Sequence, residues 1–451
     1  MTRRIRSALS LLLAAPASAL AFESVDTIPF VDQSGLMTAP TSTYGAPASA
    51  GLGGGFQGAD FPAYPREDTA LAPNTAFWTE IGVMHDSNPF RLANDANAQA
   101  ILGTTQKADT VLRYGGGVRT DQRVYGRQHL YFEARGDYYD FDRFDQLDNF
   151  AYGLLGEWRW QLGNQLSGTA GLGRTQRLAS PAEVLRPIKE TIVTDRAYAT
   201  GAYQFSPSWR LRGAVEGDRA DRERPGLDPI EAHTQTVRGG LDYVSGLGNT
   251  VGVEARTSRG TAPVNNLVDP TGAFVGNEYK ETEVAGVLTY IASSQIRFAG
   301  RLGHTERTYT EINDRDFSGT TWRALLEWLP GSKTILGFET YKAPQSVIDV
   351  AAAHVVVQGS AFTASWAPTI KWVVTGRIFE ERREGVGTPE SELLGVPARD
   401  ETVRGYRIGV GWSPVRFAEV GVGYLAQTRD SNIDLRGFDD KQVAVNLRIL
   451  F

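Results

Sequence analysis

Apolar and polar residues alternate along the final segment of the chain. The odd positions from Val443 to Phe451 are apolar, and Asn446 and Arg448 lie between them. A period of two predicts a β-strand with one apolar and one polar face, ending at a terminal aromatic residue. The same alternation continues from about residue 76 without a shift in composition. Although 451 residues could form two or three domains, we therefore expect one all-β domain over 76–451.

Two kinds of connection separate the alternating segments. Short turn signals lie at 163–164, 206–208, 245–249, 293–294, 329–332, 366–368 and 412–414, whereas longer polar stretches cover 86–107, 180–189, 221–232, 261–277, 384–398 and 430–440. Short turns that alternate with long loops are typical of a membrane barrel. The pattern predicts a transmembrane antiparallel up-and-down β-barrel of about 18 strands, with 16 as the alternative. An even strand count places both ends of the barrel on the periplasmic side.

The alternative is a soluble β-protein such as a sandwich, propeller or solenoid. Segments such as 189–205 are long for soluble strands, which typically have about 5–6 residues, and no fixed repeat marks blades or coils. Tryptophan and tyrosine also gather next to the short turns, as in the interfacial belt of a membrane barrel. These aromatic residues are Trp158, Trp160, Trp209, Tyr243, Tyr290, Trp322, Trp328, Trp366, Trp372 and Trp412.

The N-terminus predicts export from the cytoplasm. A basic start, a short apolar run over 9–15 and the small residues Ala19 and Ala21 fit a cleaved signal peptide over 1–21. The segment 22–75 is rich in Pro, Gly, Ala and Ser and predicts a flexible periplasmic linker, with a gating peptide inside the barrel as the alternative. There is no cysteine, which excludes a lipoprotein anchor and disulfides. We expect the mature chain in the outer membrane of a Gram-negative cell.

Alternation also assigns the two faces of the strands. If Trp158, Leu211 and Ile408 face lipid, their charged neighbours face the lumen, because charge on the lipid face costs about 2–4 kcal/mol for Arg or Lys at mid-depth. An arginine excess predicts a pathway for anionic solutes or polymers. The alternative is that these cations only pair with wall carboxylates such as Glu216, Glu254 and Glu327. The candidate lumen-lining residues are Arg159, Arg210, Arg212, Arg238, Arg256, Arg297, Arg301, Arg323, Lys371, Arg377 and Arg407.

Other candidate chemistry is sparse. The five histidines have no metal-ligand spacing, and only His304 with a nearby hydroxyl offers a remote hydrolase alternative. Asp86-Ser87-Asn88 and Asp430-Ser431-Asn432 are better explained by turns than by calcium. We expect no catalytic residues, no metal and no cofactor. The mild net charge of −6 gives no reason to expect a nucleic-acid partner. Tyr131, Tyr139 and Phe141 are assigned to an upper aromatic girdle, with sugar stacking as the alternative.

The segment 77–92, with its Asp86-Ser87-Asn88 corner, resembles the first strand of the β-barrel porin 2 group. The turn at Trp412-Ser413-Pro414 and the final strands are similar to that group too. Within it, the chain looks most like the EpsL-type outer-membrane proteins of exopolysaccharide operons, although His85 stands where that group has a tyrosine. The resemblance covers 77–451 and implies a barrel linked to polysaccharide export, without catalytic residues.

On this basis we expect a passive conduit that takes part in exopolysaccharide export. Its partners would be outer-membrane lipid and lipopolysaccharide, an anionic polysaccharide, and the periplasmic and inner-membrane export machinery. One alternative is a general or substrate-selective diffusion porin for small solutes. Another is a structural or surface-attachment barrel. Sequence does not separate these functions, because function belongs to the site and not to the fold.

Overall fold

The computed structural model describes residues 75–179, 188–223, 230–261, 278–310, 316–346, 354–386 and 398–451. The described residues form one closed antiparallel barrel of 18 strands, so the predicted fold is confirmed with the larger of the two strand counts. The predicted signal peptide over 1–21 and nearly all of the linker over 22–75 lie outside these residues.

The strands follow one another around the barrel in chain order. They are β1 (Thr75–Asp86), β2 (Asp109–Tyr125), β3 (Gln128–Phe141), β4 (Asn149–Leu162), β5 (Leu166–Leu178), β6 (Thr191–Ser206), β7 (Trp209–Glu223), β8 (Ile230–Val244), β9 (Thr250–Thr261), β10 (Glu278–Ile291), β11 (Ile296–Tyr309), β12 (Phe317–Gly331), β13 (Thr334–Ser346), β14 (His354–Thr369), β15 (Trp372–Val386), β16 (Asp400–Val415), β17 (Ala418–Ser431) and β18 (Phe438–Leu450). Within the described residues, the short helices α3 (Ala98–Leu102) and η2 (Asp145–Leu147) lie in connections.

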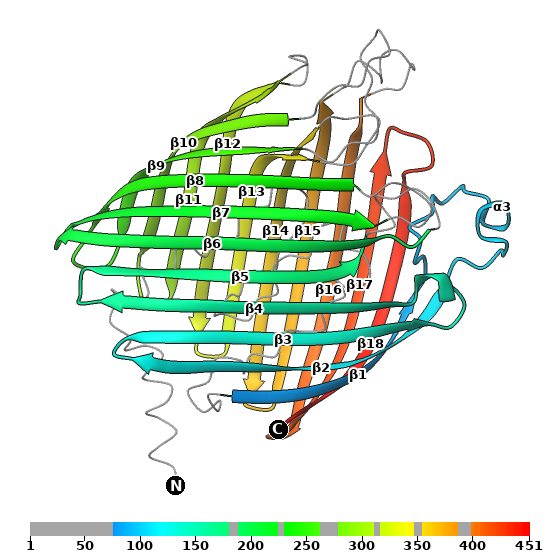
Figure 1. Cartoon of the computed structure of the whole chain (residues 1–451). Coiled ribbons are helices and arrows are strands. Elements are labelled where there is room, and N and C mark those ends of the chain that lie inside the picture. Colours follow the sequence, from blue (N-terminus) through cyan, green and yellow to red (C-terminus); the bar gives the residue numbers. More distant parts are fainter. Residues whose placement is uncertain are drawn as a thin grey trace.

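Pairing of the first and last strands closes the barrel. β1 pairs with β18 from Trp78 opposite Leu450 to Asp86 opposite Gln442, and the Phe451 amide donates to the Phe77 carbonyl at 2.8 Å. The alternating terminal segment therefore forms β18, which pairs with β17 on one side and with β1 on the other. Figure 1 shows β2 to β8 crossing in front of the opposite wall, because strands tilt strongly in a closed barrel.

Connections differ at the two ends of the barrel. The connections from even-numbered to odd-numbered strands have two to five residues, whereas the others have six to 22. The predicted alternation of tight turns with long loops is thus confirmed, but the turns expected at 366–368 and 412–414 lie at 370–371 and 416–417, because β14 and β16 continue past the Trp-Ala-Pro and Trp-Ser-Pro sequences. The connection expected over 221–232 is shorter than predicted, because β7 continues to Glu223 and β8 begins at Ile230.

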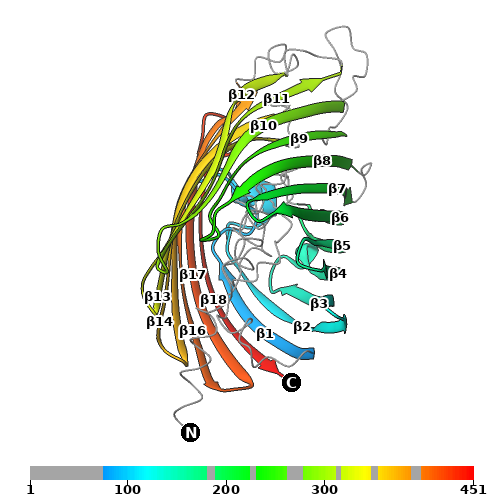
Figure 2. The same ribbon diagram turned by 90° about the vertical axis from the view of Figure 1, so that its left-hand side faces the viewer.

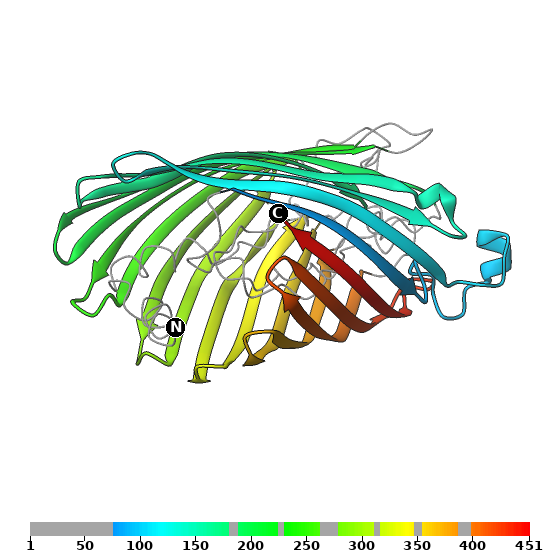
Figure 3. The same ribbon diagram turned by 90° about the horizontal axis from the view of Figure 1, so that it is seen from below.

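The outer face carries the apolar half of the alternating pattern. Leu172, Val284 and Ile378 are among its exposed side chains, and Figures 2 and 3 show that a single layer of strands surrounds the lumen. Exposed apolar residues around the whole circumference are expected where lipid replaces water. Among the described residues, neither helix has the length or apolar character to cross a membrane.

An aromatic belt surrounds the barrel near the short turns. Trp372 stacks on Trp412 with ring centroids 5.7 Å apart, and Trp209 meets Tyr243 edge-on at 5.6 Å. Trp322 departs from the predicted belt: it lies farther up β12, and the Lys342 ammonium lies 5.6 Å above its ring. The period of two assigned its face but did not fix its height, because height depends on the register of the whole strand.

Candidate functional site

Ion pairs cover the inner face of β7 to β11. The set, called here the inner-wall network, comprises Arg210, Arg212, Asp242, Glu254, Arg256, Glu281, Glu283, Arg301 and Arg307. Each residue alternates with outward-facing neighbours, so strand periodicity places all nine side chains on one side of the wall. Arg210 and Arg212 stand before and after Leu211, whose side chain is exposed on the opposite, outer face.

Each acidic residue of this network joins at least two arginines. Asp242 accepts from Arg210 at 2.8 Å and from Arg212 at 3.0 Å. Glu254 pairs with Arg212 and with Arg301, and thereby connects β7 to β11. The network is therefore continuous across five strands.

The second half of the network is arranged in the same way. Glu283 binds Arg301 at 2.8 Å and Arg256 at 3.0 Å. Glu281 binds Arg256 at 2.5 Å and Arg307 at 2.8 Å. All five side chains are largely buried against the wall, where a lone charge would be costly and mutual pairing is required.

A glycine makes the longest connection of the network possible. Gly240 on β8 lies in register with Arg212 on β7 and with Glu254 on β9. A Cβ at Gly240 would lie 3.2 Å from the Arg212 guanidinium carbon and 2.9 Å from the Val253 carbonyl oxygen. The missing side chain thus leaves the path along which Arg212 crosses β8 to reach Glu254.

The candidate lumen residues divide by their partners. Arg212 and Arg301 share Glu254, as the wall-pairing alternative proposes, whereas Arg323 pairs with Glu339 instead of Glu327. The other ion-paired candidates are Arg159 with Glu157, Arg210 with Asp242, Arg256 with Glu281, and Arg297 with Glu327.

Four candidates are not members of these ion pairs, and three of them are arginines on strands. Arg377 on β15 and Arg407 on β16 lie directly opposite each other in register, and the Arg377 guanidinium lies 5.9 Å from the Phe379 ring centre. Arg238 on β8 has inward parity beside exposed Val237.

Lys371 departs from the expected position on a strand. It lies in the turn between β14 and β15, and its ammonium donates to the Pro414 carbonyl at 3.1 Å. It therefore fastens neighbouring turns together at the short-turn end of the barrel.

A buried ion-pair group holds the first long loop at the opposite end of the barrel. Arg91 contacts Asp86 at 3.0 Å and Asp440 at 3.2 Å, and these side chains have almost no exposed surface. Burial lowers the pKa of Arg91, but the two carboxylates outweigh it and raise the pKa overall. The Asn88 amide also donates to Asp86 at 2.8 Å, so the Asp-Ser-Asn corner forms the predicted turn.

Apolar residues continue this group across the long-loop end. Phe90 and Phe144 meet edge-on at 4.9 Å, and both pack with Leu147, Tyr139 and Phe141 in one buried cluster. The girdle assignment of Tyr139 and Phe141 is therefore wrong, because both rings are buried in this cluster. Sequence reasoning missed the cluster, since Phe90 and Phe144 lie in loops without periodicity.

Tyr131 also departs from the predicted upper girdle. It lies near the β2–β3 turn, donates to Glu133 and lies 4.9 Å from the Arg159 guanidinium. Its parity places it on the inner face, so it cannot contribute to an outer belt.

The histidines are dispersed over the barrel. His304 on the outer face contacts Ser318 at 3.2 Å and Glu306 at 3.6 Å, both through Nε2. A catalytic triad needs its nucleophile and its orienting acid on opposite ring nitrogens, so this grouping does not have triad geometry. Among the described residues, no cluster of His, Asp and Glu has the arrangement of a metal site.

The inner-wall network includes residues that were not among the sequence candidates. Arg307 lies fully buried between Glu281 and the Tyr279 ring. A signal was present, because Arg307 has the same parity as Arg297 and Arg301 on one strand. Sequence reasoning missed Arg307 because it concentrated on residues near the short turns, and Arg307 lies near the other end of β11.

Comparisons with known proteins find similarity in fold only. No family model and no curated protein sequence matches the chain. OccK2 (OpdF) of Pseudomonas aeruginosa is 10% identical, with 84% of this chain and 98% of that chain covered and a TM-score of 0.46. A BenF-like porin from Pseudomonas fluorescens Pf-5 is also 10% identical, with 83% and 98% covered and a TM-score of 0.46. The alcaligin receptor FauA of Bordetella pertussis is 11% identical, with 83% and 76% covered and a TM-score of 0.39.

At these identities and scores the similarity is too remote to say anything about function. The resemblance to the EpsL-type group finds no support in the comparisons, and that family stays a prediction.

Proposed function

We propose that the chain is an outer-membrane channel through which small charged solutes diffuse, with a preference for anions. The observation that carries this proposal is the inner-wall network inside a closed barrel with an apolar outer face. A barrel of this size is wide enough to hold water, and the charges held along the wall set the electrostatic potential that a passing ion experiences.

The preference for anions rests on the balance of charge. The inner-wall network contains five arginines and four carboxylates, and Arg238 extends it on β8. Fixed positive charge raises the local concentration of anions and lowers that of cations. Because each arginine of the network also has a carboxylate partner, we expect a modest preference and not exclusion of cations.

A second arginine group supports the same direction of selectivity. Glu401 on β16 binds Arg399 at 2.6 Å and lies within 4.0 Å of Arg429 and 3.8 Å of Arg436. These residues lie at the long-loop end, where a solute from outside would enter. These side chains are buried, but their positive charge would act electrostatically on an anion before it reached the inner-wall network.

A closed structural barrel is the second candidate. It is favoured by the apolar cluster around Phe90, Phe144 and Leu147, which packs loop residues at the long-loop end. Exopolysaccharide export remains a prediction from the family resemblance, because neither the described residues nor the comparisons supply a feature specific to a polymer.

Planar-bilayer recording of the purified, refolded barrel tests the proposal. We expect stepwise conductance and a reversal potential of anionic sign under a potassium chloride gradient. A barrel that folds, as shown by heat-modifiable migration, but never conducts would favour the structural candidate. Fractionation tests the location separately, since recovery in the soluble periplasmic fraction would contradict an outer-membrane protein.

A further inference from the structure

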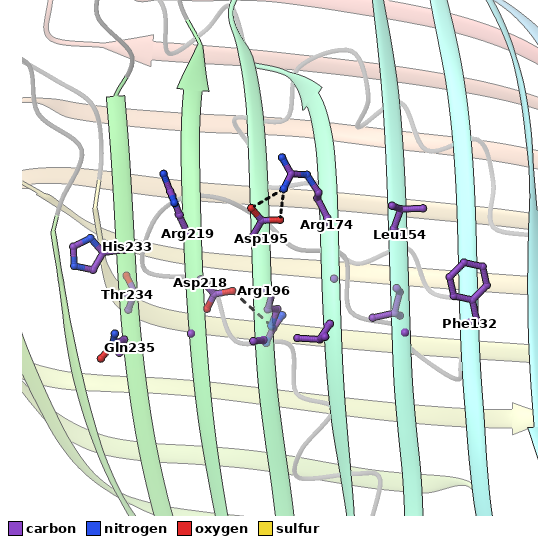
Figure 4. A pocket seen from close by; sticks show the side chains of 16 residues that line it. Phe132, Leu154, Arg174, Asp195, Arg196, Asp218, Arg219, His233, Thr234 and Gln235 are labelled. Atoms are coloured by element: carbon purple, nitrogen blue, oxygen red, sulfur yellow. Dashed lines mark hydrogen bonds and ion pairs between the residues drawn. The ribbon is translucent and has the colours of Figure 1, made fainter. Parts of the chain in front are cut away.

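The short turns of the barrel carry charge of one sign. These eight turns, all of them among the described residues, cover 126–127, 163–165, 207–208, 245–249, 292–295, 332–333, 370–371 and 416–417 and hold no aspartate or glutamate. Their charged residues are Arg127, Lys333, Lys371 and Arg416. Figure 4 shows the contrast on the outer face nearer the long loops, where Arg174 pairs with Asp195 at 3.2 Å.

Three of the four cations lie in successive turns along the rim. Lys333 lies between β12 and β13, Lys371 between β14 and β15, and Arg416 between β16 and β17. These strands are neighbours in the barrel, so adjacent turns are two strands, or about 10 Å, apart. All three residues are exposed. The three cations are called here the basic edge.

Hydrogen bonds between neighbouring hairpins fix the two lysines in the same way. The Lys333 ammonium donates to the Pro368 carbonyl at 2.7 Å, and the Lys371 ammonium donates to the Pro414 carbonyl at 3.1 Å. Each lysine carbonyl also accepts a backbone amide of the same neighbouring hairpin at 2.8 Å. Because an ammonium has three donors, each lysine keeps two for a ligand.

The acidic groups near the basic edge leave its two lysines uncompensated. Glu327 lies on the inner face of β12 and holds Arg297 at 3.7 Å, and Glu419 is buried on the inner face of β17. The carboxylate at Phe451 lies beside the β16–β17 turn, where it can offset Arg416. Neither lysine makes an ion pair within the described part of the chain.

The basic edge borders the aromatic belt. Trp366, Trp372 and Trp412 on the flanking strands are exposed on the outer face, and tryptophan marks the level at which hydrocarbon gives way to lipid headgroups. Ile370 and Phe417, which stand beside the cations in their turns, are exposed as well. An edge that combines exposed apolar and basic residues at this level fits the surface of a bilayer better than it fits an acidic protein in water.

We propose that the basic edge binds anionic phospholipids of the periplasmic leaflet, whose phosphates accept from Lys333 and Lys371. This inference rests on the proposed outer-membrane location, but it does not depend on conduction. Binding is measured on the purified barrel, so a negative result would leave the fractionation and conductance tests unaffected.

Native mass spectrometry of the barrel in detergent tests the edge, with phosphatidylglycerol as the probe. The double variant Lys333→Gln/Lys371→Gln should bind roughly ten- to twentyfold more weakly, because each basic residue at a membrane surface contributes about 1 kcal/mol, or about fivefold. The matched control is Lys280→Gln/Lys441→Gln, which removes two exposed lysines near the long-loop ends of β10 and β18. This control should bind like the unchanged protein.

A second set of variants separates charge from the hydrogen bonds between hairpins. Lys333→Arg/Lys371→Arg keeps both charges and should keep phosphatidylglycerol binding. Heat-modifiable migration confirms that each variant is folded, and the single variants Lys333→Gln and Lys371→Gln, each expected to lose roughly fivefold, replace the double variant if it does not fold.

Unchanged phosphatidylglycerol binding in the glutamine variants, or an equal loss in the Lys280→Gln/Lys441→Gln control, would overturn the proposal. Equal affinity of the unchanged protein for phosphatidylcholine would overturn the assignment of an anionic lipid, because that headgroup has no net charge. Binding that does not weaken as salt is raised would contradict it too, since exposed charges are screened within about 3 Å at 1 M salt.

Discussion

Glu254→Gln should increase the anion preference of the channel. The side chain is almost fully buried in the wall and pairs with Arg212 and Arg301. Its replacement removes one negative charge while keeping size and hydrogen-bonding groups. The inner-wall network then holds five arginines against three carboxylates.

The size of the change follows from Coulomb's law. One added charge acts on an ion about 7 Å away in water with about 0.6 kcal/mol, and screening at 0.1 M salt reduces this to about 0.3 kcal/mol. Because anions gain and cations lose this amount, the permeability ratio of anions to cations should rise roughly threefold. At 1 M salt the Debye length is about 3 Å and the effect should nearly vanish.

Reversal potentials under a salt gradient measure this ratio. Arg212→Gln should shift the ratio in the opposite direction, and Glu380→Gln supplies the control. Glu380 pairs with Arg404 at 2.7 Å on the outer face, so its loss changes the same charge outside the pathway. If the Glu254 and Arg212 variants conduct with unchanged selectivity, or shift it in the same direction, the inner-wall network does not line the pathway.

The same substitution should also weaken the barrel, but moderately. Loss of one partner of a buried pair costs about 3–5 kcal/mol when the other charge is left alone. Here Arg212 keeps Asp242 at 3.0 Å and Arg301 keeps Glu283 at 2.8 Å. We therefore expect Glu254→Gln to lower the free energy of unfolding by about 2–3 kcal/mol, as measured by urea unfolding from lipid vesicles.

Three further outcomes follow from the fold. A cysteine in place of Ala100 in α3 should react with an impermeant thiol reagent on whole cells, whereas one in place of Ser332 in a short turn should not; the reverse result would invert the topology. Arg91→Ala leaves Asp86 and Asp440 buried without their shared cation and should destabilise the barrel by about 3 kcal/mol in urea unfolding. Gly117→Ala should lower the thermal unfolding midpoint because its Cβ would clash with the Trp78 ring, while Gly201→Ala, with open space around it, should leave the midpoint unchanged.

The sequence was sufficient for the barrel because every strand repeats the same simple rule. Alternation of period two specifies which residues face lipid, and turn chemistry specifies where the chain reverses. The contrast between Leu211 outside and Arg210 inside needs only parity, which one strand contains by itself. The terminal strand is predicted for the same reason, whereas its pairing with β1 is seen only in the structure.

The long-loop end could not be foreseen in this way. Phe90 and Phe144 have no period to assign them, and Arg91 finds Asp440 only after the two ends of the barrel have met. The contact joins positions near opposite ends of the barrel domain, so no local pattern contains it. The Asp86-Ser87-Asn88 sequence predicts a turn, but it gives no reason for a cation to follow five residues after Asp86.

The ion pairs within the wall are partly predictable from the sequence. Parity places the charged residues on the inner face, but their pairing depends on strand register and on the size of the residues between the two partners. Arg212 could have stayed with Asp242 alone, yet it also reaches Glu254 across a whole strand. It can do so because Gly240, which lies between them in register, has no side chain. The inner-wall network therefore depends on this glycine as well as on its charges, since a methyl group there would lie 3.2 Å from the Arg212 guanidinium carbon and would force that side chain to shift.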